Sequence, residues 1–268
     1  MQQPRGGVDE APPADDLAGR TQKGLEGAVV VVTGCSRGMG PGWVKVLLGE
    51  GCTVIATFRS KVSALLEDLK GEFGSKLHNM QLDVGSEESI AAFAERLPTV
   101  VDKVDILVNN AGIGEANDPL MEVSGAFLKD CFAVNTVGPT LLIQKLVPLM
   151  KNSSVFKTIV NVNSDLGSLA VATMAAKNPS NTQITACAYR VSKAALSMVT
   201  ASMARELAED SFIVITISPG HVDTDMGHLP APGRPKPTLS VEDSVRGMLR
   251  VIRCLSPADN CSFWKYNG

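Results

Sequence analysis

The chain of 268 residues carries a net charge of −3, and 44% of its residues are hydrophobic and 20% are charged. This composition is typical of a packed globular protein and excludes wholesale disorder. The small negative charge gives no reason to expect nucleic acid or an anionic membrane surface as a partner. No apolar run reaches ~18 residues, so no membrane span is expected, and residues 1–20 lack the apolar core of a signal peptide.

The cysteines and histidines indicate neither disulfides nor a metal site. The six cysteines are scattered without a C-x-x-C pair, and the three histidines are widely dispersed. We therefore expect reduced thiols in a cytoplasmic protein that binds no metal. Residues 1–26 are rich in Pro, Gly, Asp and Glu and lack periodicity, so a disordered tail is expected rather than a functional segment. Residues 27–268 remain for the folded part, as one large α/β domain or two small ones.

The first predicted strand spans residues 28–33, a continuous β-branched run that indicates burial on both faces. Glycines directly after it allow a tight turn, close approach of the backbone to phosphates, and packing of the next helix on the sheet. Pro41 suits the first turn of that helix, whose N–H groups would face an anionic pyrophosphate. We therefore predict a dinucleotide-binding turn, made by Gly34, Cys35, Ser36, Arg37, Gly38, Met39 and Gly40.

The second predicted strand, residues 53–58, is followed by Arg59. Sites that prefer NAD place an acidic residue about 20 positions beyond the glycines, where it takes the ribose hydroxyls. This chain has no carboxylate there, and Arg59 together with Arg37 would bind a 2′-phosphate through charge-assisted hydrogen bonds. The alternative is that both are solvated surface arginines. The pattern favours NADP(H) over NAD(H).

Strand and helix patterns continue to alternate along the chain. Further strands are predicted at residues 78–82, 105–108, 158–162 and 214–218, with a short edge strand at 262–266. Further helices are predicted at residues 62–73, 86–97 and 127–150, from near residue 189, and after residue 240, with Ser86 and Ser240 as N-caps. This order predicts an α/β fold with a doubly wound parallel sheet, helices on both faces, and ligands at the carboxyl ends of the strands.

Several predicted strand ends carry residues suited to such a ligand site. They are Asp83 and Val84, then Asn110, Ala111 and Gly112, then Ser164, and finally Pro219, Gly220, Val222 and Thr224. Asn135 is different, because it lies within an otherwise apolar helix. A buried asparagine must be hydrogen-bonded, so it either braces the helix or holds a water.

Tyr189 and Lys193 stand four residues apart, so their side chains meet on one face of a helix. A lysine ammonium beside a phenol stabilises the phenolate and lowers its pKa from about 10. A shift of roughly 2 to 3 units would let Tyr189 act as a general acid or base at cellular pH. The spacing Y-x-x-x-K also occurs by chance in many helices, so the pair alone does not establish catalysis.

Taken together, these motifs resemble the signature of the short-chain dehydrogenases/reductases, over residues 27–266. The motifs are Thr33-Gly34-x-x-x-Gly38-x-Gly40, Asn109-Asn110-Ala111-Gly112, Ser164, Tyr189-x-x-x-Lys193 and Pro219-Gly220. Within that family, residues 188–193 and the closing Phe263-x-x-Tyr266-x-Gly268 are similar to the sniffer and C-factor-like carbonyl reductases. The resemblance implies a single Rossmann-type domain at residues 27–268.

The resemblance also implies roles for individual residues. Tyr189 would protonate a substrate carbonyl as hydride arrives from the nicotinamide, and Lys193 would lower the tyrosine pKa and bind the nicotinamide ribose. Ser164 would orient the carbonyl, and Asn135 would hold a water linked to Lys193. The cofactor contacts would be Asp83 and Val84 to adenine, Asn110, Ala111 and Gly112 to the ribose side, and Pro219, Gly220, Val222 and Thr224 to the carboxamide and pyrophosphate. Residues 127–150 and 190–207 would form the surfaces of a homodimer or homotetramer.

The chain departs from the family pattern near Tyr189. Ser164 and Tyr189 are farther apart than in most family members, and the excess falls in residues 170–186. This stretch, with its core at 177–182, is predicted to be a long loop over the site. Asn163 stands where many relatives have another serine. The proline-rich residues 227–239 are either a mobile lid or a rigid connection.

Two function classes follow from these observations. The first is an NADPH-dependent oxidoreductase that acts on the carbonyl or hydroxyl of a small organic molecule. The second is a non-catalytic NADP(H)-binding sensor or scaffold of the same fold. The presence of Asn135, Ser164, Tyr189 and Lys193 together favours the enzyme.

Overall fold

The computed structural model describes residues 17–115, 119–177, 186–229 and 235–268. Its centre is a seven-stranded sheet in the order β3-β2-β1-β4-β5-β6-β7, in which every paired register is parallel. The strands are β1 (Val29–Val32), β2 (Thr53–Phe58), β3 (Leu77–Gln81), β4 (Ile106–Asn109), β5 (Thr158–Val162), β6 (Ile213–Ser218) and β7 (Phe263–Lys265). The predicted doubly wound α/β fold is therefore confirmed.

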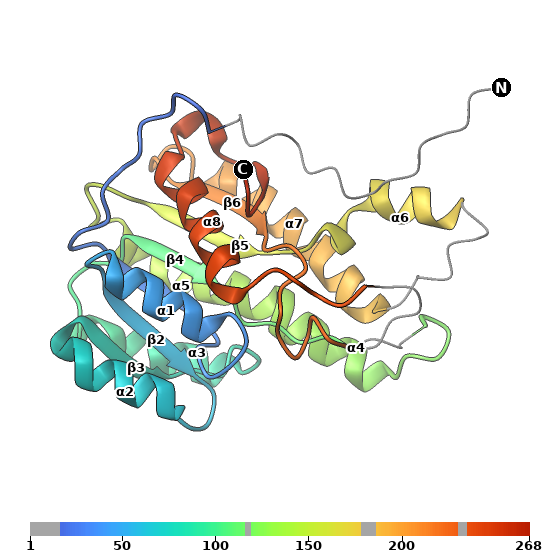
Figure 1. The fold of residues 1–268 in the computed structure, drawn as a ribbon, viewed down its shortest axis with the longest axis horizontal. Coiled ribbons are helices and arrows are strands. Elements are labelled where there is room, and N and C mark those ends of the chain that lie inside the picture. Colours follow the sequence, from blue (N-terminus) through green and yellow to red (C-terminus); the bar gives the residue numbers. More distant parts are fainter. Residues whose placement is uncertain (1–16, 116–118, 178–185, 230–234) are drawn as a thin grey trace.

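Helices cover both faces of the sheet, and β1 shows how the sequence achieves this. Val30 and Val32 pack into the core formed with α1 (Gly40–Gly49), α2 (Ala64–Phe73) and α8 (Val241–Cys254). Val29 and Val31 point to the opposite face, into the core formed with α3 (Glu87–Arg96), α5 (Gly138–Met150) and α7 (Cys187–Glu206). Both faces are apolar because both are covered, as parallel sheets require. Figure 1 shows α1 and α8 side by side in front of the sheet.

The long helix predicted at residues 127–150 begins earlier and is interrupted. α4 (Gly125–Phe132) starts where the Ser124 hydroxyl accepts from the amide of Phe127, and a π-helical turn at Ala133–Val137 separates it from α5. The 26 residues are long and apolar enough to cross a membrane by length and composition alone. In this fold, however, α5 buries Leu142 and Leu146 against the sheet, and a core helix has the same composition.

The prediction of a loop after Ser164 is wrong for its first part. α6 (Leu169–Ala176) is helical, because the Ser168 hydroxyl accepts from the amide of Val171 and the segment is rich in good helix formers. None of its side chains is buried, and Figure 1 shows α6 projecting from the body of the domain. The predicted loop core at 177–182 lies outside the described residues from 178 onward, as do residues 230–234 of the proline-rich segment.

The described part of the predicted tail, residues 17–26, packs on the domain and so differs from the expected disorder. Leu17 and Leu25 are buried. Arg20 donates to the carboxylate of Asp259 at 2.8 Å, and its guanidinium lies 5.3 Å from the ring centroid of Trp264. These partners are more than 230 residues away along the chain, so local composition gives no indication of them. The segment therefore packs against the edge of the sheet that β7 forms.

Candidate active site

A cavity of about 580 Å³ opens at the carboxyl ends of the strands, where a doubly wound sheet binds its ligands. It is lined by every residue predicted for the cofactor or for catalysis except Cys35, Gly40 and Asn135. The lining members of that set are Gly34, Ser36, Arg37, Gly38, Met39, Arg59, Asp83, Val84, Asn110, Ala111, Gly112, Ser164, Tyr189, Lys193, Pro219, Gly220, Val222 and Thr224.

The floor of the cavity is the turn between β1 and α1. Its position is fixed by Thr33, whose hydroxyl accepts from the amides of Asn110 and Ala111 at 3.0 and 2.9 Å. Gly34 has φ +72°, and a Cβ there would lie 2.9 Å from the Cα of Ala111, so only glycine fits. Gly40 is outside the cavity because it packs on the turn itself: a Cβ there would lie 2.2 Å from the carbonyl oxygen of Gly34. Its contribution is the close contact between helix and turn.

The cavity lining includes three cationic side chains. Arg37 and Arg59 line it as predicted, and Lys61 joins them. Lys61 was not predicted, because the prediction for the end of β2 considered only a carboxylate or an arginine. Its place two residues after Arg59 is a usable indication. Three cationic side chains in a glycine-floored cavity suit a ligand with several phosphates.

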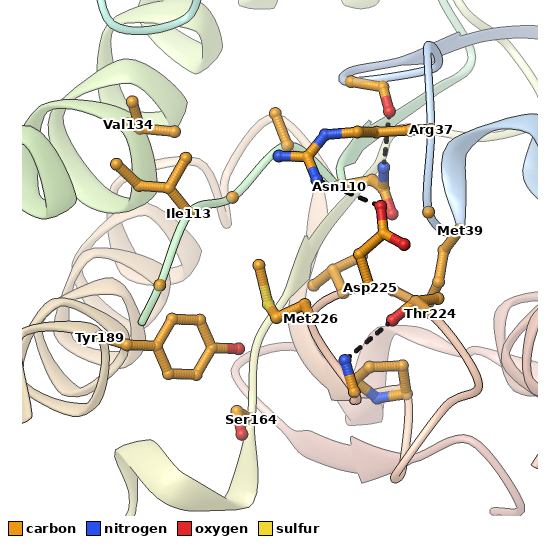
Figure 2. Close-up of a pocket in the computed structure, with 18 of the residues that line it drawn as sticks. Arg37, Met39, Asn110, Ile113, Val134, Ser164, Tyr189, Thr224, Asp225 and Met226 are labelled. Carbon is orange, nitrogen blue, oxygen red and sulfur yellow. Dashed lines mark hydrogen bonds and ion pairs between the residues drawn. The ribbon is translucent and has the colours of Figure 1, made fainter. Parts of the chain in front are cut away.

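Asp225, which the sequence patterns did not indicate, also lines the cavity. Its carboxylate lies 3.5 Å from the guanidinium of Arg37, and both side chains are largely exposed. Figure 2 shows this ion pair joining the glycine turn to the segment after β6. That segment is internally bonded, because the amide of Gly227 donates to the Thr224 hydroxyl and the amide of Asp223 donates to Leu239 O.

Tyr189 and Lys193 lie one turn apart on α7, as the sequence predicts. The ammonium nitrogen of Lys193 is 5.6 Å from the Tyr189 ring centroid and donates to Val162 O at 2.7 Å. Lys193 is only 3% exposed, and burial lowers its pKa from 10.5 to about 8. Figure 2 shows the hydroxyl of Tyr189 pointing into the space that Ser164 and Met226 also line. The site therefore holds a phenol next to a lysine that can change its charge near neutral pH.

Contacts with the backbone hold the side chains of Tyr189 and Ser164 in place. A Cβ on Gly114 would lie 2.9 Å from Cδ2 of the Tyr189 ring, so the loop after β4 packs closely against that ring. Ser164 follows β5 in an extended conformation, and its Oγ accepts from the amide of Leu166 at 3.2 Å. This bond uses a lone pair of the serine oxygen, so the hydroxyl hydrogen remains able to donate to a ligand in the cavity.

Asn135 is fully buried in the π-helical turn and braces the site from behind. Its amide exchanges two hydrogen bonds with the backbone of Ile113, at 2.9 and 2.8 Å, and donates to Ser192 Oγ at 2.9 Å. Ser192 in turn donates to Tyr189 O at 2.7 Å. Of the two roles open to Asn135, the structure therefore shows the brace, and the water link to Lys193 stays a prediction.

Comparisons with known proteins identify the family and several relatives of this chain. Residues 28–232 match the model of a family described as short chain dehydrogenase. C-signal of Myxococcus xanthus is 37% identical over 177 residues, which are 66% of this chain and 96% of that protein. A 3-oxoacyl-(acyl-carrier-protein) reductase of Aquifex aeolicus is 33% identical over 205 residues, 75% of this chain and 77% of that protein.

Two solved structures of carbonyl reductases are similar over nearly the whole described fold. The NADPH-bound carbonyl reductase from chicken fatty liver is 30% identical with a TM-score of 0.79, covering 91% of this chain and 98% of its own. Carbonyl reductase Sniffer of Drosophila melanogaster is 29% identical with a TM-score of 0.77 and the same coverage. The resemblance drawn from the motifs is therefore confirmed at the level of the family.

Proposed function

Since the chain belongs to the short-chain dehydrogenase family, we propose that it is an NADPH-dependent reductase of small aldehydes or ketones. The oxidoreductase class follows from the family, and the finer assignment rests on the site. The observation that carries it is the convergence of Tyr189, the buried Lys193 and Ser164 on one cavity, which Arg37, Arg59 and Lys61 also line. A protein that only binds a dinucleotide has no need for the first three.

Three observations support a nicotinamide dinucleotide phosphate as the ligand of this cavity. Its floor presents backbone at Gly34, where a side chain would collide with Ala111, so phosphates can approach closely. At the end of β2 the chain has Arg59 and Lys61 in place of a carboxylate, which supports NADP(H) over NAD(H). A similar carbonyl reductase, from chicken fatty liver, was solved with NADPH bound, and this supports the same choice. The bound cofactor would supply the hydride.

The protein residues then divide the remaining work. Ser164 donates to the carbonyl oxygen of the substrate and holds it against the Tyr189 hydroxyl, from which that oxygen receives its proton. Lys193 stabilises the phenolate that Tyr189 leaves behind, because its charge is held in a buried position beside the ring. Reversal of these steps oxidises an alcohol when NADP⁺ is in excess.

The test is NADPH oxidation over a panel of aldehydes and ketones, with wild type and Tyr189→Phe. The variant should lose at least about 100-fold in kcat, the usual contribution of a positioned acid, while it still binds NADPH. Tyr266→Phe is the matched control, because Tyr266 is the chain's other tyrosine and should be dispensable. Full activity of Tyr189→Phe would exclude the proposed acid. NADPH binding without turnover of any carbonyl would support a sensor or scaffold instead.

We also propose that the protein is a homo-oligomer. Val137, Val191 and Met198 are exposed by 43%, 41% and 69%, on the π-helical turn before α5 and on α7. Burying these apolar side chains against a second copy would stabilise a dimer. Light scattering of wild type and Met198→Glu tests this, since a charge in the contact should lower the measured mass.

A further inference from the structure

Strand β5 is bonded to the catalytic helix through two asparagine side chains. The amide of Asn161 donates to Thr200 Oγ1 at 2.9 Å. The amide of Asn163 donates to Ser197 Oγ at 2.8 Å and to Lys193 O at 3.2 Å. Alternate residues of a strand share a face, and helix positions three and four apart share a face, so the two contacts repeat along one line between β5 and α7.

Asn163 differs from Asn161 in what else it touches. Its side-chain oxygen accepts from the amide of Ser164 at 2.9 Å. The side-chain amide of Asn163 therefore contacts the backbone of Ser164, which is proposed to bind the substrate carbonyl. It also contacts the turn of α7 that carries Lys193. Asn161 instead accepts from Asn109, away from the cavity.

Three hydrogen bonds hold this side chain in its position. Asn163 is 1% exposed, both of its N–H groups are used, and its oxygen is used once. Apolar packing would tolerate a small slide of α7 along β5, whereas directional bonds to fixed acceptors do not. A misplacement of about 1 Å between reacting groups lowers rates on the order of 100-fold, so the register of these two elements matters for catalysis.

We propose that Asn163 is a positioning residue that fixes Ser164 relative to the Tyr189–Lys193 pair. The proposal rests on the proposed reductase activity for its kinetic consequence. A serine at this position, as in many members of the family the motifs resemble, has a single donor hydrogen and a shorter reach. It therefore cannot make the three contacts at once.

The kinetic test compares Asn163→Ala, Asn163→Ser and, as the control, Thr200→Val. The control removes the neighbouring bond between β5 and α7 while conserving the shape of the side chain. Asn163→Ala should lower kcat roughly 10- to 100-fold, with the Kd for NADPH changed less than about twofold and Asn163→Ser intermediate. Thr200→Val should lower the melting temperature but leave kcat within about threefold, because it is remote from Ser164. Equal loss of kcat in Asn163→Ala and Thr200→Val would refute the positioning role.

A second measurement needs no turnover and uses the fact that the chain has only two tyrosines. In a Tyr266→Phe background, the ultraviolet titration of phenolate reports Tyr189 alone. Asn163→Ala should raise the midpoint, because the lysine ammonium moves away from the ring, and Thr200→Val should leave it unchanged. An unchanged midpoint in Asn163→Ala overturns the inference. If wild type reduces no carbonyl but the midpoint moves, the proposed function fails and the positioning of the pair stands.

Discussion

The guanidinium of Arg37 lies 3.5 Å from the carboxylate of Asp225, so the residue proposed to bind the 2′-phosphate is already paired with an anion of the same chain. Bound NADP(H) would compete with Asp225 for Arg37. Asp225→Asn should therefore tighten NADP(H) by up to about fivefold at low salt, the range of an exposed ion pair, and leave NAD(H) nearly unchanged. Cofactor titrations by fluorescence measure this, and the gain should vanish when Arg37 is also replaced.

Arg37→Ala and Arg59→Ala should each weaken NADP(H) much more than NAD(H). The expected difference is about 1.5 to 3 kcal/mol, the contribution of a charged hydrogen bond to the phosphate that only NADP(H) carries. Comparison of the two dissociation constants for each variant checks the assignment. An equal loss for both cofactors would mean that these arginines do not bind the 2′-phosphate.

Lys193 should make stability depend on pH in a defined window. Burial lowers its pKa from 10.5 to about 8, so between these values the unfolded chain holds the proton that the folded protein has released. The contribution of Lys193 to stability therefore rises with pH across that window, and below pH 8 the folded state carries a buried charge. Any advantage of Lys193→Met over wild type should shrink as pH rises from 8 toward 10.5.

Urea unfolding of both proteins at several pH values measures this difference. Cys35 and Cys52 act in the opposite direction, because burial raises the pKa of each thiol to about 12 and their contribution falls above the ordinary thiol pKa of 9.0. Both proteins contain them, so their effect cancels in the difference. A difference that does not change with pH would show that Lys193 titrates at its ordinary value.

Gly114→Ala should impair catalysis more than folding. The added methyl would lie 2.9 Å from Cδ2 and 3.1 Å from Cγ of Tyr189, so the ring or the loop must move. We expect kcat to fall by about tenfold or more, since the hydroxyl shifts with the ring. Gly71→Ala is the control: no atom lies within 4 Å of its added Cβ, and alanine in a helix should stabilise by about 0.5 to 1 kcal/mol. Unchanged kcat in Gly114→Ala would show that the loop yields instead.

Arg20→Ala should destabilise the domain although Arg20 is far from the cavity. Burial by itself would raise the pKa of Asp259, but hydrogen bonds from Arg20 and Ser256 outweigh it, and the pKa lies below its ordinary value. Loss of the arginine should lower the free energy of unfolding by about 1 to 2 kcal/mol at neutral pH, and less in acid where Asp259 is protonated. Arg246→Ala, which removes an exposed pair with Glu242, should change it by less than about 0.5 kcal/mol. Equal effects of the two substitutions would contradict this account.

The strands and the cavity could be predicted because their causes are local. Runs of β-branched residues mark β1 and β5, and the ends of parallel strands meet at one edge, so residues such as Gly34 and Ser164 had to come together. Tyr189 and Lys193 followed from helical spacing alone. The N-caps at Ser86 and Ser240 were predicted in the same way, and each hydroxyl accepts a hydrogen bond from the amide three residues later.

What the sequence patterns missed depends on contacts that are distant along the chain. Asp225 reaches Arg37 only after the sheet brings β1 and β6 to the same edge. Asn163 was noted as a departure from the family, yet its bonds to α7 depend on how the helix sits on the strand. The helix α6 was missed for another reason: its eight residues, apolar except for Thr173, precede a segment with strong turn chemistry, which dominated the prediction.

The first and last described residues, Leu17 and Gly268, lie against each other. A Cβ on Gly268 would lie 2.9 Å from Cδ1 of Leu17, while β3, at the far edge of the sheet, lies next to the exposed turn at Gly74. A permuted chain could join residues 268 and 17 through a short linker and begin at that turn instead. Every element that holds Ser164, Tyr189 and Lys193 would then lie in the interior of the new chain.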